Sequence, residues 1–349
     1  MNKPFKVSQS KLKTWKTCKY KYHLKYNERL NPEVKGRPLV YGSIIHEMIE
    51  AHTEGHNPFK KLRQIKKKQG KLFERERELY GNIIETAEVV FEAYLEFYED
   101  EPLHFIKIQG RRSEHEFELE IAPGIVFIWK VDGFVRSPAG LRYLLENKTG
   151  ANIPDEDDRW RDLQVHMYIK TSEMLGIKKF DGVCWNYVKS SEPTVPEYLP
   201  KSNRLSTRKI NTLPAIVHMQ LEEHELETKG HEVLIERAEE AVSKFFERKF
   251  EPVNRRVMEE TFESFLIVAN EMRELTPTRK EKNIDRHCKW CDFRSICRAE
   301  LTGGDVEGIK EREFSIGRRD ETAAEKAARE KERKTRSKKV ARRKRSNKS

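Results

Sequence analysis

Residues 124–150, GIVFIWKVDGFVRSPAGLRYLLENKTG, decide the fold of this chain. Apolar residues recur there with a period of two on both sides of the Ser-Pro-Ala-Gly turn, a pattern typical of β-strands. The preceding stretch 115–121, HEFELEI, alternates in the same way. These three strands predict a β-meander whose last strand carries the polar triplet Glu-Asn-Lys.

Helices and further strands are expected on both sides of the meander. The spacing of apolar residues predicts helices over 8–18, 41–52, 71–100 and 158–175, strands over 178–189 and 214–221, and a long charged helix over 222–250. Gly176 is a suitable stop for the fourth of these helices. The sequence therefore predicts an α/β fold with a central mixed sheet flanked by helices.

The net charge of the 349-residue chain is +11, and nearly all of it lies at the C-terminal end. Residues 310–349 hold 17 Lys+Arg against 7 Asp+Glu, so residues 1–309 are close to neutral. Length and charge together predict one domain over 1–309 and a basic, disordered tail over 310–349. The chain has no apolar run long enough for a membrane span and no apolar N-terminal signal, which predicts a soluble intracellular protein.

The clearest candidate chemistry belongs to Asp132, Glu146 and Lys148. Side chains alternate along a strand, so Glu146 and Lys148 project to one face, and Asp132 lies near the end of the preceding strand. Two carboxylates with the main-chain carbonyl of Asn147 can bind Mg²⁺ or Mn²⁺, which lowers the pKa of a bound water. The Lys148 ammonium could orient the nucleophile or offset charge on a phosphate, chemistry that suits phosphodiester hydrolysis. When the triplet is taken alone, a charged strand end holding an ion pair is the better explanation.

The surrounding sequence favours the first interpretation and carries a family resemblance. Gln164 and Tyr168 are four residues apart and therefore share one face of the helix that follows. With His46 in GSIIHEMIEAH, the ordered set Asp132, Glu146, Lys148, Gln164 and Tyr168 resembles the RecB-like branch of the PD-(D/E)XK nuclease superfamily. The resemblance implies a restriction-endonuclease-like core. It also implies that His46, Asp132 and Glu146 are metal ligands, that Lys148 is the catalytic lysine, and that Gln164 and Tyr168 position DNA.

Three of the five cysteines crowd into CKWCDFRSIC at 288–297. Cys288 and Cys291 can chelate one centre, Cys297 can close onto it, and Cys18 is the candidate fourth ligand. The spacing resembles the helical C-terminal region of AddB-type and CRISPR-associated exonucleases, which implies a [4Fe-4S] cluster. Lys19 stands where that family often has Pro after the first cysteine. A zinc site that includes His287, or buried thiols without a metal, are the alternatives, and Cys184 is expected to be a core thiol.

The resemblance implies a metal-dependent DNA exonuclease of DNA recombination, repair or replication, in a prokaryotic cytoplasm or that of a virus-infected host. Its partners would be single-stranded DNA or duplex ends. A separate helicase or recombination protein would supply any unwinding, because the chain has no GxxxxGK[ST] loop. A non-catalytic DNA-binding accessory protein and a ribonuclease on the same scaffold are the alternative functions.

Overall fold

The computed structural model describes residues 4–69, 74–101, 103–208, 210–276 and 278–317. They divide into two compact units. The first unit comprises Met1–Gln9 and Val34–Asn270, and the second comprises Ser10–Glu33 and Glu271–Ser349. The tail expected over 310–349 is described only up to residue 317, and the rest of it lies outside the described residues.

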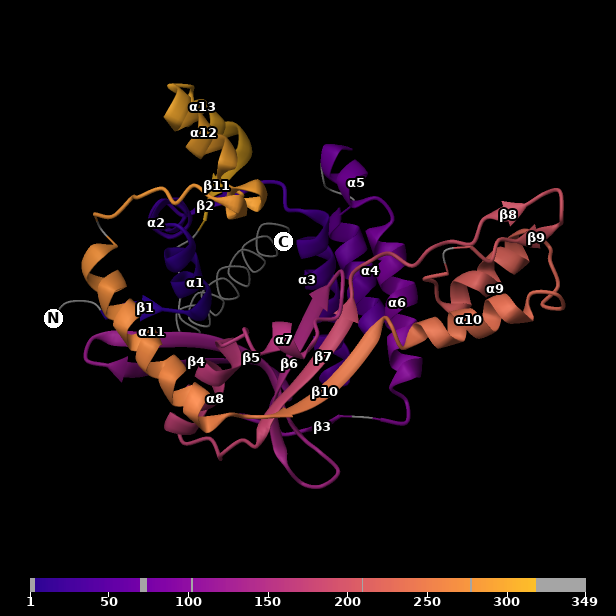
Figure 1. The fold of residues 1–349 in the computed structure, drawn as a ribbon, viewed down its shortest axis with the longest axis horizontal. Coiled ribbons are helices and arrows are strands. Elements are labelled where there is room, and N and C mark those ends of the chain that lie inside the picture. Colours follow the sequence, from indigo (N-terminus) through magenta and orange to yellow (C-terminus); the bar gives the residue numbers. More distant parts are fainter. Residues whose placement is uncertain (1–3, 70–73, 102, 209, 277, 318–349) are drawn as a thin grey trace, which may run out of the picture. The chain divides into compact units, whose positions relative to one another are not determined.

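A seven-stranded mixed sheet forms the centre of the first unit (Figure 1). Its strands are β1 Phe5–Val7, β3 His104–Phe105, β4 Ser113–Ala122, β5 Ile125–Arg136, β6 Arg142–Gly150, β7 Gly182–Lys189 and β10 Phe246–Pro252. The main path runs β1-β5-β6-β7-β10, and β3 and β4 pair with β5 as well. The three strands predicted from the alternating pattern are β4, β5 and β6, and the expected α/β class is confirmed.

Strand β5 is the longest strand, and its two halves have different neighbours. β1 pairs in parallel with Ile125–Phe127, and antiparallel β6 pairs only with the distal half, from Gly133 to Arg136. On the other edge β4 pairs with most of β5, and its register shifts between Glu120 and Ala122. Such a bulge moves every residue beyond it by one position relative to the partner strand.

Helices cover both faces of this sheet. Those of the first unit are α3 Arg37–Thr53, α4 Pro58–Gln69, α5 Glu74–Tyr80, α6 Ile83–Phe97, α7 Glu156–Arg159, α8 Gln164–Met174, α9 Pro214–Glu223, α10 Glu232–Val242 and most of α11 Arg255–Leu275. Helices α3, α4 and α6 share one apolar core, which includes Met48, Phe91 and Phe246. Successive residues of β6 point to opposite faces of the sheet. On one face Glu146 accepts a hydrogen bond from Gln164 of α8, and on the other Asn147 is connected through Asn186 to Tyr94 of α6.

Two predicted helices are interrupted. The helix expected over 71–100 is split into α5 and α6 at Gly81, whose φ of 51° lies in the left-handed region. The helix expected over 158–175 is split into short α7 and α8, with a turn between them, and Gly176 ends α8 as predicted. The turn between α7 and α8 carries side chains that reach the candidate site.

Residues 190–244 form a small module between β7 and β10, and two predictions for this region are wrong. The stretch 214–221 is helix α9 rather than a strand, because Pro214 occupies its first turn and Val217 and Leu221 form a buried stripe. The single helix expected over 222–250 is instead the end of α9, then α10, then strand β10, with Gly230 at φ 91° between the helices. Strands β8 Tyr198–Leu199 and β9 Arg204–Leu205 complete the module.

The second unit joins segments from both ends of the chain. It contains most of α1 Gln9–Thr17, α2 Lys19–Tyr22, a π-helix His23–Asn27, β2 Leu30–Pro32, a 3₁₀ helix Arg286–Trp290, α12 Arg294–Thr302, α13 Val306–Glu313 and β11 Phe314–Ile316. β2 and β11 pair antiparallel. Residues 310–316 therefore belong to a helix and a strand, although they were expected in the tail. None of the helices in the described ranges combines the length and apolar character needed to cross a bilayer.

Candidate active site

The candidate site lies where β5 and β6 separate. The ladder between them ends at the Gly133–Leu145 pair, so Asp132 and Glu146 are the first residues past it. The main-chain N–H of Asn147 donates to Asp132 Oδ2 at 2.6 Å. This bond replaces the missing ladder bond and holds the carboxylate beside β6.

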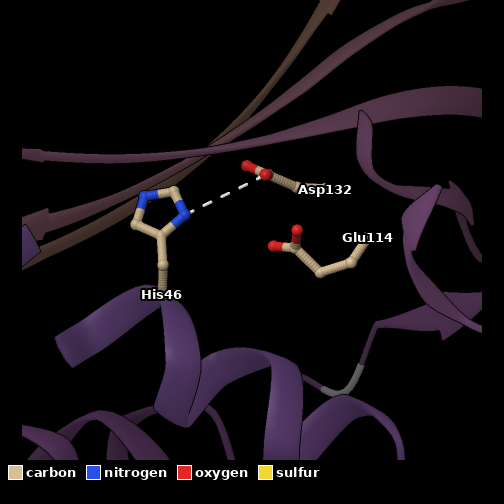
Figure 2. Close-up of side chains that lie close together, drawn as sticks. All are labelled: His46, Glu114 and Asp132. Carbon is tan, nitrogen blue, oxygen red and sulfur yellow. Dashed lines mark ion pairs between the residues drawn. The ribbon is translucent and has the colours of Figure 1, made fainter. Parts of the chain in front are cut away.

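His46 of α3 and Glu114 of β4 converge on Asp132 (Figure 2). One ligand atom from each of the three residues lies within 4.8 Å of the other two. His46 Nδ1 is 3.9 Å from Asp132 Oδ1. One imidazole and two carboxylates are a suitable donor set for Mn²⁺ or Mg²⁺. The structure therefore brings together two of the predicted ligands and adds a third residue.

Glu114 was not predicted from the sequence. The β4–β5 register places it opposite Asp132, between the pairs Ser113–Gly133 and His115–Val131. Its backbone φ is 56°, a left-handed conformation that costs a non-glycine residue about 1–2 kcal/mol. Such strain concentrates at functional sites. The ion pair that Glu114 makes with Lys130 compensates the charge of its partly buried carboxylate.

Glu146 and Lys148 project together from β6, as the alternation predicts. Glu146 Oε1 lies 2.8 Å from Lys148 Nζ and accepts a hydrogen bond from Gln164 Nε2 at 3.1 Å. Lys148 Nζ is also 2.9 Å from Asp162 Oδ2, a contact that the sequence analysis did not identify. Glu146 is outside the compact group of three, because its carboxylate is engaged by the lysine and the glutamine.

Tyr168 follows Gln164 by one turn of α8 and is 8% exposed. Its ring packs near Phe127 of β5, with centroids 6.3 Å apart. Burial raises the pKa of its hydroxyl, and the nearby carboxylates of Glu146 and Asp132 raise it further. Tyr168 is therefore a neutral, buried group beside the site.

Burial dominates the electrostatics of the site. It raises the pKa of both Asp132 and Glu146, and their mutual repulsion raises that of Glu146 further. Burial lowers the pKa of His46, which keeps its imidazole neutral and able to bind a cation. Burial also acts to lower the pKa of Lys148, but Glu146 and Asp162 outweigh it and the net shift is upward. The amine is thus positively charged among carboxylates that are costly to ionise.

This arrangement defines a class of protein. Buried carboxylates whose pKa is raised favour a bound cation, and a charged amine held beside them can stabilise a developing phosphate charge. A mixed sheet that presents such a set where two strands separate is the architecture of a metal-dependent phosphodiester hydrolase.

Comparison with known proteins identifies the family. The model of the PD-(D/E)XK nuclease superfamily matches residues 6–298, and the chain belongs to this superfamily. It is therefore a phosphodiester hydrolase of a family that cleaves DNA and generally uses divalent cations such as Mg²⁺. Curated proteins include no significant match.

Two solved structures are similar to the chain over most of their length. One is an Eubacterium rectale protein named as a candidate exonuclease, with 16% identity, a TM-score of 0.45, and coverage of 87% of this chain and 95% of its own. The other is SSO0001, with 13% identity, a TM-score of 0.27, and coverage of 84% and 96%.

Replacing Glu114 by Gln is expected to weaken Mn²⁺ binding about tenfold or more, because one anionic donor of the set is lost. Isothermal titration of the metal into each variant measures this. Glu116→Gln, an exposed carboxylate two residues along the same strand, is the control and should bind like the wild type. Equal affinities for all three proteins would exclude Glu114 as a ligand.

Because Glu146 is protonated more readily in the folded protein, its contribution to the stability of the metal-free protein should be larger in mild acid than at alkaline pH. Its pKa is raised in the folded state, so the folded protein keeps a proton that the unfolded chain releases. That contribution is fully present below the unfolded pKa and is lost as pH rises through the folded pKa. In EDTA, the Tm of the wild type relative to Glu146→Gln should therefore be higher at pH 5 than at pH 8. A Tm difference that does not vary with pH would contradict the assignment.

Proposed function

We propose that the protein is a metal-dependent DNA exonuclease of the RecB-like type. The observation that carries this proposal is the convergence of His46, Glu114 and Asp132 on one point while Lys148 stands at the neighbouring Glu146. The exonuclease assignment rests on the resemblance of the ordered motif set to the RecB-like branch. A separate helicase or recombination protein belongs to the same proposal as the source of duplex unwinding.

The cation would be held by five groups, namely His46, Asp132, Glu114, Glu146 and the main-chain carbonyl of Asn147. When bound, the cation supplies a Lewis acid that polarises the phosphate and lowers the pKa of a coordinated water.

Lys148 would hold the scissile phosphate and the attacking water in line. The carboxylates of Glu146 and Asp162 fix its Nζ at 2.8 and 2.9 Å, which pre-organises the positive charge before substrate binds. The hydrogen bond from Gln164 to Glu146 Oε1 would orient the carboxylate so that Oε2 faces the cation. Tyr168 would pack helix α8 against Phe127 of the sheet.

We further propose that the second unit holds a [4Fe-4S] cluster bound by Cys18, Cys288, Cys291 and Cys297. These four residues line one cavity of about 270 Å³. The main-chain N–H groups of Lys21 and Asn283 donate to Cys18 Sγ at 3.4 and 3.5 Å, and hydrogen bonds to the sulfur ligands are among the features that tune iron–sulfur sites.

Among the four cysteine sulfurs, all in residues that the structure describes, no three lie within 4.8 Å of one another, whereas a single zinc ion would require a closer group. In a tetrahedral site, Zn–S bonds of about 2.3 Å bring the sulfurs to about 3.8 Å from one another. Within the described residues, the sole group of three or more ligands lying within 4.8 Å of one another is the one at His46. His287 Nε2 is buried without a hydrogen-bond partner in the described structure and borders the cavity, so a zinc site that includes it is the competing outcome.

Nuclease activity is tested with end-labelled linear single-stranded DNA, duplex DNA, circular single-stranded DNA and RNA, with Mn²⁺ or with EDTA. The wild type should degrade linear DNA with Mn²⁺ and leave circles intact. Lys148→Ala should lower kcat about 10²- to 10³-fold, because a pre-organised charge is lost. Lys178→Ala, an exposed lysine after α8, is the control.

Each other outcome is informative. If no substrate is cleaved and Asp132→Ala equals the wild type, the enzyme assignment fails and a binding protein is favoured. Cleavage of circles would indicate an endonuclease, and preference for RNA would indicate a ribonuclease.

The cluster is tested on anaerobically purified protein. A broad absorbance near ~400 nm is expected, with iron and sulfide in equal amounts. Cys291→Ala should lose the absorbance and lower the Tm before it affects cleavage chemistry, because the site joins segments from both chain ends. Cys184→Ala removes a fully buried thiol of β7 and should keep the absorbance. A colourless protein containing zinc, or a Cys291→Ala variant with unchanged Tm, would contradict the proposal.

A further inference from the structure

Trp160 is exposed in the turn between α7 and α8, two residues before Asp162, whose carboxylate contacts Lys148 of the candidate active site. Its side chain is 64% exposed, whereas Trp185 on the neighbouring strand β7 is 2% exposed. The indole N–H of Trp185 donates to Glu251, and its ring lies 5.9 Å from Lys148 Nζ. The exposed ring of Trp160 is therefore free of the packing that holds Trp185 and is open to a ligand.

The turn that carries Trp160 is anchored on its first side by Arg159. This residue is 4% exposed, and its guanidinium donates to Glu251 Oε1 at 2.6 Å and to the carbonyl of Pro154 at 2.7 Å. A buried, doubly bonded arginine leaves its backbone little freedom. The residue after it is therefore held at the surface.

The turn is anchored on its second side by Asp162. Its N–H donates to the Arg159 carbonyl at 3.0 Å, and its carboxylate lies 2.9 Å from Lys148 Nζ. Trp160 is two residues from Asp162, so their Cα atoms are at most about 7 Å apart. Trp160 is thus close along the chain to the carboxylate that contacts Lys148, and the next residue, Arg161, is also exposed.

An exposed aromatic ring beside cations is the arrangement by which proteins bind single-stranded nucleic acid, because bases stack on the ring while cations contact the backbone. Bases inside a duplex are already stacked on both sides and offer no free face. We propose that Trp160 stacks on an unpaired base next to the scissile phosphate, and that single-stranded DNA is the substrate of this site. This inference rests on the proposed nuclease function and specifies its substrate.

The kinetic test compares a thymidine oligonucleotide with one that has abasic residues at the cleaved end. Trp160→Ala should raise KM for the normal strand about 5- to 150-fold, the range for loss of one stacked base, and leave KM for the abasic strand unchanged. Trp160→Phe keeps an aromatic ring and should restore most of the loss. An equal effect on both strands, or no effect on either, would overturn the proposal.

The binding test needs no catalysis, so it separates this inference from the nuclease assignment. In EDTA, the oligonucleotide should quench the tryptophan fluorescence of the wild type and of Trp290→Phe, a control that removes another exposed tryptophan, 74% exposed. The quenching should be lost in Trp160→Phe, which replaces one aromatic ring by another and so preserves the fold. Quenching that persists in Trp160→Phe would refute the stacking. Quenching lost as expected, in a protein that hydrolyses no DNA, would uphold the stacking and refute the nuclease function.

Discussion

The hydrogen bond from the main-chain N–H of Asn147 to Asp132 Oδ2 is the contact on which the site depends. β5 and β6 separate at that level, and without this bond Asp132 would be free to turn away from His46 and Glu114. Asn147 is also held on the other face of the sheet, where Asn186 donates to its side-chain oxygen at 2.8 Å. Asn186 is fully buried and also donates to Tyr94 of α6. A buried polar network thus holds the side chain of the residue whose main-chain N–H contacts Asp132.

The two buried carboxylates of the site are costly to ionise, so the site favours a positive charge beside them. Burial raises the pKa of Asp132 and Glu146, and the left-handed backbone of Glu114 adds local strain. Lys148 compensates for part of the negative charge through Glu146 and Asp162. This residual cost is the usual consequence of pre-organising a charged site, and the apolar core of α3, α4 and α6 offsets it.

The second unit is built differently from the first, because its elements come from both chain ends. β2 pairs with β11, and Phe293 and Phe314 stack with centroids 5.4 Å apart in a small core that also includes Leu24. A core of this size stabilises weakly by itself. The cluster proposed for the four cysteines would add a crosslink between the two chain segments of this unit.

Local patterns in the sequence were sufficient where one strand or helix face carries the signal. The alternation over 115–150 predicts β4, β5 and β6, and it places Glu146 and Lys148 on one face. Local patterns were not sufficient for the short apolar run at 214–221, whose spacing does not distinguish a helix from a strand. They were also not sufficient for 246–252, which is a strand because it pairs with β7.

The tertiary structure alone decided which β4 residue joins the site. Without the bulge between Glu120 and Ala122, His115 would face Asp132; with it, Glu114 does, and His115 is buried against Phe134. A one-residue shift reverses which side chains face the site, because side chains alternate along a strand, and it depends on pairing between strands that no local pattern records.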